Sequence, residues 1–197
     1  MKKWIELLVI YVILPGLLYF YPIWPIAILP VAGFLVFLLV RHERGVFNRK
    51  VPLGKILWQF ILLAVCLTLF AYFFARDNFF IIFSYSRMLP LLLAITYPLF
   101  AVIPQTLIYR TLFFQRYAKL FPDNLLILVN AVLFSFGHVI YQNAVALLLT
   151  FFAGLIFAYN YKNDRSFWGS VLLHSLLGIY LFYVGIGIYL VTFIQRY

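Results

Sequence analysis

Charged side chains are scarce in this sequence, and acidic ones are scarcer still. Only 10% of the 197 residues are charged and 66% are hydrophobic. An average soluble domain carries about 25% charged residues. This composition excludes a soluble globular domain, an intrinsically disordered chain and a coiled coil, because each of these needs many more polar side chains.

Cysteine is nearly absent, since Cys66 is the single one in the chain. A lone cysteine excludes an intramolecular disulfide and a cysteine-based metal site within one chain. Cys66 lies in the middle of the apolar run ILLAVCLTLF. We expect it to be a small core residue, with a reactive thiol as the alternative.

Basic residues outnumber acidic ones by 15 to 5, which gives a formal net charge of +10. Such an excess is also typical of nucleic-acid-binding proteins. Here the basic residues lie in short segments between long apolar runs. We therefore expect them to anchor loops at the cytoplasmic face of a lipid bilayer, and we expect no nucleic-acid partner.

Long apolar runs dominate the chain. A membrane-spanning helix needs about 20 mostly apolar residues, and such runs cover residues 4–21, 25–40, 56–75, 88–104, 124–141, 144–161 and 167–195. The last run is long enough for one tilted helix or for two short helices, broken near Gly178 or Gly185. The sequence therefore predicts an all-α, polytopic membrane helix bundle with seven or eight transmembrane helices, formed by residues 1–197 as a single integral membrane domain.

The basic residues predict the orientation of this bundle, because Lys and Arg accumulate in short cytoplasmic loops. They cluster in alternate loops, at Lys2 and Lys3, at residues 41–55, at Arg116 with Lys119, and at Lys162 with Arg165. This pattern predicts a multi-pass protein of the plasma (inner) membrane with a cytoplasmic N-terminus. The N-terminal MKK before an apolar run is similar to a signal anchor, which we expect to be retained.

Polar residues inside the runs are the candidates for function, because ionisable groups are costly in a bilayer. One such segment is PQTLIYRTLFFQRY, in which Pro104 suits the first turn of a new helix. Thr106 and Arg110 lie four residues apart and share a helix face, and Gln105 lies next to it. The alternative is an amphipathic interfacial helix whose Arg110 extends to lipid headgroups.

Two histidines supply the other candidates. Phe134 and His138 lie four residues apart in the run 124–141, so the phenyl and imidazole rings are expected to pack together on one helix. His174 lies early in the last run, four residues after Ser170. For either histidine alone, a core side chain hydrogen-bonded to a hydroxyl or a carbonyl is the simpler interpretation.

The order of these motifs resembles that of the CPBP family, the CAAX-processing and bacteriocin-processing (Abi) intramembrane endopeptidases. The family pattern is E-E-x-x-x-R, then F-x-x-x-H, then H-x-x-x-N/D, on a core of about eight helices. In this chain it aligns with Gln105-Thr106-x-x-x-Arg110, Phe134-x-x-x-His138 and His174, within a family-like core over residues 89–190.

This resemblance implies peptide-bond hydrolysis within the membrane, in which a glutamate activates water and histidines hold that water or stabilise the oxyanion. It places the catalytic positions at Gln105, Thr106, Arg110, Phe134, His138 and His174. However, Gln105 and Thr106 replace the glutamates, and Gly178 stands where the third motif has Asn or Asp. Neither an amide nor a hydroxyl is a general base near neutral pH, so we expect proteolysis to be weak or absent.

We expect no other acid to replace the missing glutamate. The acidic residues, Glu6, Glu43, Asp77, Asp123 and Asp164, fall in loops or at the ends of runs. Arg110 is therefore expected to bind backbone carbonyls, Tyr109, lipid phosphate or water. His138 and His174 are the candidate ligands for a divalent metal, but a catalytic zinc ion usually has a further protein ligand, so no cofactor is favoured.

Two functions from different classes stay open. The first is an intramembrane endopeptidase-like protein with weak or absent activity toward a hydrophobic or lipidated peptide. The second is a non-catalytic binding or immunity-type membrane protein that holds a hydrophobic peptide or helix in the same cavity. A transporter ranks below both, because no acid is expected mid-membrane for ion coupling. The substrate and the oligomeric state are left open.

Overall fold

All regular secondary structure in the part of the chain that the structure describes is helical. The computed structural model describes residues 1–20, 25–42, 46–47 and 50–190. Its α-helices are α1 (Lys2–Leu8), α2 (Leu14–Phe20), α3 (Pro25–Val40), α4 (Leu53–Phe74), α5 (Ile81–Tyr85), α6 (Leu89–Tyr97), α7 (Ile103–Thr106), α8 (Leu126–Phe136), α9 (Ala144–Asp164) and α10 (Phe167–Tyr183). Wide π turns at Val9–Ile13, Pro98–Val102 and Leu107–Tyr117 continue some of these helices without a break.

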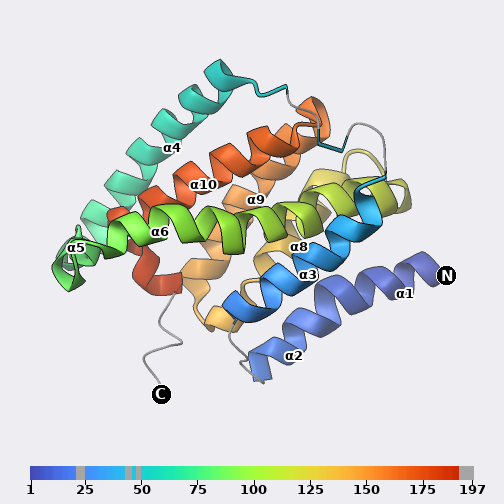
Figure 1. The fold of residues 1–197 in the computed structure, drawn as a ribbon, viewed down its shortest axis with the longest axis horizontal. Coiled ribbons are helices and arrows are strands. Elements are labelled where there is room, and N and C mark those ends of the chain that lie inside the picture. The colour runs from blue at the N-terminus through green and yellow to red at the C-terminus, as the bar shows by residue number, and fades with distance from the viewer. Residues whose placement is uncertain (21–24, 43–45, 48–49, 191–197) are drawn as a thin grey trace.

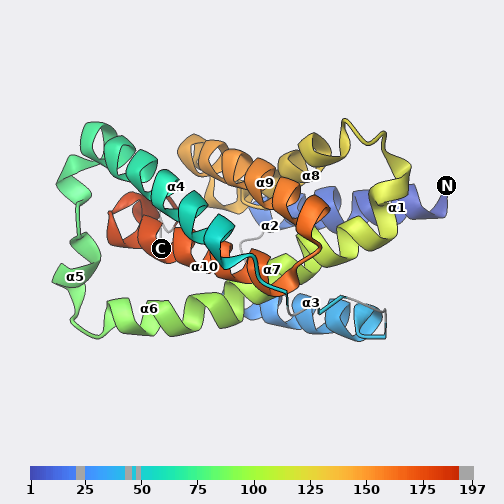
Figure 2. The same cartoon turned by 90° about the horizontal axis from the view of Figure 1, so that it is seen from above.

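Helix α10 runs through the middle of the bundle. Figure 2 shows α4, α8 and α9 along one side of it and α3 and α6 along the other. Figure 1 shows that α6 and its continuation cross the face of the bundle in front of α10. Segments far apart in the sequence therefore meet around the first half of α10, where His174 lies.

Four described helices are long and apolar enough to cross a membrane: Lys2–Phe20, Leu53–Phe74, Leu89–Leu120 and Ala144–Asp164. Three shorter apolar helices accompany them, at Ala27–Val40, Leu126–Tyr141 and Phe167–Tyr183. Large hydrophobic side chains such as Phe34, Leu39 and Phe73 are exposed on the outside of the bundle, which suits lipid and not water. The chain is thus a multi-pass membrane helix bundle, as the apolar runs predicted.

Pro104 does not begin a new helix, so that expectation is wrong. Leu89–Leu120 is a continuous helix of 32 residues that passes through it. The π turn Pro98–Val102 lies just before Pro104, so the hydrogen-bond ladder is already shifted where the proline lacks its N–H. Gly33 of α3 packs against this point, because a Cβ at position 33 would lie 2.6 Å from the Pro104 Cβ.

The last apolar run contains one helix followed by a short 3₁₀ turn. Helix α10 ends at Tyr183 and the turn covers Ile186–Leu190. The break falls at Gly185, whose φ of +88° favours glycine, and a Cβ there would collide with the Asn78 backbone. Gly178 lies inside α10, and positions 191–195 of the predicted run lie outside the described residues.

Cys66 is exposed on α4 and is not a core residue, which corrects the expectation from the sequence. Lipid accommodates apolar side chains about as well as a protein interior does. An apolar run in a membrane protein therefore does not show which of its faces is buried.

The aromatic core of the bundle fixes the N-terminal helix against the Leu89–Leu120 helix. Tyr11 is fully buried and its hydroxyl donates to the backbone oxygen of Ile108 at 2.6 Å. Its ring lies edge-on against Tyr109, Phe113 and Tyr117. These contacts hold the polar segment around Arg110 inside the protein.

Candidate functional site

Side chains from four helical segments meet at one buried pocket inside the bundle. Its lining residues are Gln105, Thr106, Arg110, Phe134, Phe157, Ser170 and His174. They come from the Leu89–Leu120 helix, α8, α9 and α10, and all of them are buried. The side chains leave no room for a water-sized sphere between them, so the pocket is closed in this structure.

The structure brings most of the predicted site residues to this pocket. Gln105, Thr106 and Arg110 line it together, as their spacing on one helix predicted, and Phe134 and His174 line it from α8 and α10. His138 is not among the lining residues, although its ring packs on Phe134 with the ring centroids 4.7 Å apart. The catalytic role of these side chains stays a prediction.

The Phe134 and His138 rings pack together as predicted, although α8, the α-helical part of the apolar helix Leu126–Tyr141, ends before His138. The helix ends at Phe136, and the His138 N–H donates to the Ser135 carbonyl in a tighter turn. Gly137 at this point is a poor helix former. The His138 Nδ1 donates to the Phe134 carbonyl at 2.7 Å, so Nε2 keeps the lone pair of the neutral ring.

Arg110 points into the bundle and not toward lipid headgroups, so the interfacial interpretation is wrong. It is 2% exposed. Its Nη1 donates to Asn130 Oδ1 and to the Tyr109 carbonyl, the latter at 3.3 Å, which confirms the expected carbonyl partner. Its Cζ lies 4.6 Å from the centre of the Phe134 ring and 5.7 Å from that of Phe157, within cation–π range. None of the described residues forms a hydrogen bond with its Nη2.

Asn130 is a residue of this site that the sequence prediction missed. It is fully buried on α8, and its Nδ2 donates to the Tyr109 carbonyl at 2.7 Å while its Oδ1 accepts from Arg110. Asn130 thus provides a neutral acceptor for a buried cation. Its polar side chain within an apolar run is the signal that could have found it.

His174 lies in a largely aromatic environment. Its ring centroid is 4.7 Å from that of Phe157 and 5.7 Å from that of Phe134. The Tyr97 hydroxyl reaches its Nε2 at 3.4 Å, across 77 positions of sequence. The sequence prediction also missed Tyr97, and nothing in its local sequence marks it.

No acidic side chain within the described ranges lines the pocket. Glu6, Asp123 and Asp164 form ion pairs of 2.7 Å with Arg116, Lys162 and Lys55, respectively. Asp77 lies in the 3₁₀ turn Arg76–Asn78, and Glu43 lies outside the described residues. The pocket therefore combines a guanidinium, an imidazole, an amide and hydroxyl groups, but no described residue provides it with a carboxylate.

The described residues contain no group of three or more His, Cys, Asp or Glu side chains placed to hold a metal ion. His138 and His174 both pack against the Phe134 ring. By number of ligands, these two histidines do not fit a catalytic zinc site.

Fold and pocket together define the class: a multi-pass helix bundle with a buried polar site between its helices. Residues 87–180 match the model of a family described as type II CAAX prenyl endopeptidase Rce1-like. This part of the chain therefore belongs to the Rce1-like CAAX protease family, which confirms the resemblance read from the motifs. No curated protein and no solved structure matches the chain.

Proposed function

We propose that this protein is a CAAX-protease-like membrane protein in which peptide-bond hydrolysis is strongly weakened or lost. The observation that carries this proposal is a pocket that holds Arg110 and His174 but has no carboxylate among the described residues that line it. A general base needs a lone pair and a pKa near the working pH. Gln105 and Thr106, at the glutamate positions, offer only an amide and a hydroxyl.

His174 is the lining residue that accepts a proton most readily near neutral pH. However, Tyr97 already lies at its Nε2, at 3.4 Å. Phe134 and Phe157 pack on the same imidazole, and the closed pocket has no space for a water molecule among its lining side chains. His174 is therefore a poor substitute for the missing base, which supports weak or absent turnover.

One specific observation favours the second function, a non-catalytic binding or immunity-type protein. Arg110 Nη2 and Gln105 Oε1 are buried and have no hydrogen-bond partner within the described part of the chain. Each such group costs roughly 1–3 kcal/mol. A hydrophobic peptide or helix would recover this loss, with a backbone carbonyl or terminal carboxylate accepting from Nη2. Phe134 and Phe157 would have to change rotamer to admit it.

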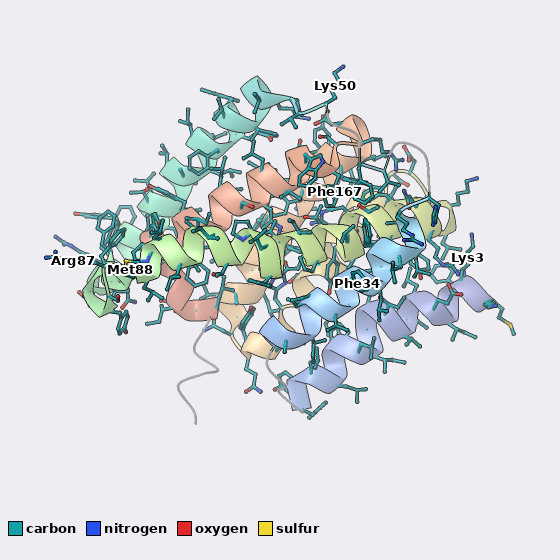
Figure 3. All side chains as sticks on the ribbon, in the orientation of Figure 1. Lys3, Phe34, Lys50, Arg87, Met88 and Phe167 are labelled. Carbon is teal, nitrogen blue, oxygen red and sulfur yellow. The ribbon has the colours of Figure 1, made fainter. Side chains whose placement is uncertain are left out.

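We also propose that the three shorter apolar helices cross the membrane, so that the bundle has seven spans and a cytoplasmic N-terminus in the plasma (inner) membrane. Figure 3 shows Lys3 and Arg87 at opposite ends of the bundle. The ion pair of Glu6 with Arg116 holds a further basic residue near the N-terminal end. Cysteines introduced at positions 3 and 87 should react with an impermeant maleimide from opposite sides, and labelling from the same side would contradict this topology.

The substitution Thr106→Glu tests the proposed loss of hydrolysis. We expect the wild-type protein in lipid vesicles to cleave neither prenylated nor unmodified fluorogenic peptides above the rate of empty vesicles. The T106E variant should gain cleavage, because its carboxylate, four residues before Arg110, can pair with Nη2 and accept a proton from water. The control T106Q matches the size of Glu without its charge and should stay inactive.

Two outcomes would contradict the proposal. Cleavage by the wild-type protein that His138→Ala abolishes would show that the site is active without the glutamate. A folded T106E variant that still cleaves nothing would show that position 106 does not carry the base. For the binding function, full activity in a cellular assay after combined substitution of Arg110, His138 and His174 would exclude a role for this site.

A further inference from the structure

We infer that Tyr97 replaces the side chain missing from the third motif and positions the imidazole of His174. The inference deepens the proposed function, because it concerns the same pocket. It also changes the interpretation of Gly178. From the motif alone, this glycine is a second departure from the family pattern, because it stands where the third motif has Asn or Asp.

The first observation is steric. Gly178 has no side chain, and a Cβ built on it would collide with Cε1, Cζ and Oη of Tyr97. The phenol ring therefore occupies the space that an Asn or Asp side chain at position 178 would enter. The ring is held there by edge-on contacts with His174 and Phe182, at centroid distances of 6.2 and 5.9 Å.

The second observation is chemical. Residues four apart on a helix lie on the same face, so an Asn or Asp at position 178 would stand beside His174 and offer it a hydrogen bond. Tyr97 arrives from α6 instead and brings its hydroxyl to Nε2 at 3.4 Å, which is long for a hydrogen bond. The polar partner has thus moved from α10 to a neighbouring helix, while its place next to the imidazole is kept.

This partner matters because the other ring contacts of His174 are apolar. Phe134 and Phe157 restrict the imidazole sterically, but they cannot select which nitrogen carries the proton. A phenol that donates to Nε2 leaves the proton of the neutral ring on Nδ1. With Tyr97 in this role, the departures from the family pattern reduce to the two missing glutamates, at positions 105 and 106.

An exchange of the two side chains tests the inference without any need for catalysis. Gly178→Asn alone should lower the thermal midpoint in detergent, because Tyr97 fills the space. Tyr97→Ala alone should also lower it, because it opens a cavity beside His174. The double variant Y97A/G178N should recover most of the loss of either single variant, since Asn then occupies the vacated space.

A spectroscopic readout separates positioning from packing. In protein with ¹⁵N-labelled histidine, Tyr97→Phe keeps the ring and removes the hydroxyl. We expect it to shift the His174 ring nitrogen resonances, to leave those of His138 unchanged and to alter the midpoint little. Y97A/G178N should restore a bonded Nε2. Tyr180→Phe is the matched control, because Tyr180 lies on α10 together with His174 but its hydroxyl pairs with Thr68 at 2.6 Å.

The inference is wrong if Tyr97→Phe leaves the His174 nitrogen resonances unchanged, or if the double variant is no more stable than the worse single one. In the T106E background, Tyr97→Phe should reduce any gained cleavage, and Y97A/G178N should retain it. An inactive T106E protein with the expected histidine spectra would overturn the proposed function but leave the role of Tyr97 standing.

Discussion

Arg110 and Arg116 lie six residues apart on one helix, yet their environments are opposite. Arg116 is exposed over 47% of its side chain, and its Nε and Nη2 donate to the Glu6 carboxylate at 2.7 and 2.9 Å. Arg110 is 2% exposed and has an amide oxygen, a carbonyl and two aromatic rings as partners. The Glu6 carboxylate thus pairs with the exposed Arg116, and none of the described acidic side chains forms an ion pair with the buried Arg110.

This arrangement is the reverse of what stability alone would favour. An exposed ion pair contributes only about 0–1 kcal/mol, whereas a buried charge without its partner costs several kcal/mol. Local arrangements that lower stability are typical of functional sites. The contrast between the two arginines therefore supports a function for the Arg110 pocket and a structural role for the Arg116 pair.

The largest effect is expected at Asn130. Asn130→Leu removes the side-chain acceptor of Arg110 and should lower the free energy of unfolding by about 3 kcal/mol, measured by denaturant titration in detergent. Arg110→Met in the same protein should recover part of this loss, because no charge then remains buried. An unchanged stability of N130L would show that Arg110 is satisfied elsewhere, which would remove the basis of the comparison.

An intermediate effect is expected for a neutral buried hydrogen bond in the same region. Tyr11→Phe removes the hydroxyl that donates to the Ile108 carbonyl and should cost about 1 kcal/mol in the same titration. Tyr85→Phe, at a tyrosine that is 66% exposed, is the matched control and should change little. If Y11F costs as much as N130L, the charge of Arg110 is not the reason for the larger loss.

The smallest effect is expected at the exposed pair. Glu6→Gln should lower the free energy of unfolding by less than about 1 kcal/mol. This loss should shrink further as salt is added, because exposed charges are screened. A loss that equals that of N130L and persists in high salt would contradict the distinction between the two arginines.

The helical segments were predictable because hydrophobicity over many residues is a property of the local sequence. The corrections arose where a neighbour decides the outcome. Pro104 stays inside a helix that has a π turn before it and Gly33 packed against it. Cys66 faces outward because an apolar surface suits lipid as well as it suits the protein core.

The candidate site was predictable in part for the same reason. Thr106 and Arg110 meet because their spacing matches one turn of a helix. Asn130 and Tyr97 were missed because their partners lie 20 and 77 positions away along the chain. Hydrogen bonds over such distances depend on how helices pack, and the spacing of motifs does not record that.

The sequence by itself determined the multi-pass bundle and the order of the family motifs. It also determined that an amide and a hydroxyl stand at the two glutamate positions. These features follow from residue identity and short-range helix geometry. Only the tertiary structure decided that Asn130 accepts a hydrogen bond from Arg110, that Tyr97 fills the space beside Gly178 and that the pocket is closed. The physical reason is that helices with apolar side chains on all faces can pack in many ways. The buried contact of each polar group is therefore defined only once the helices are in place.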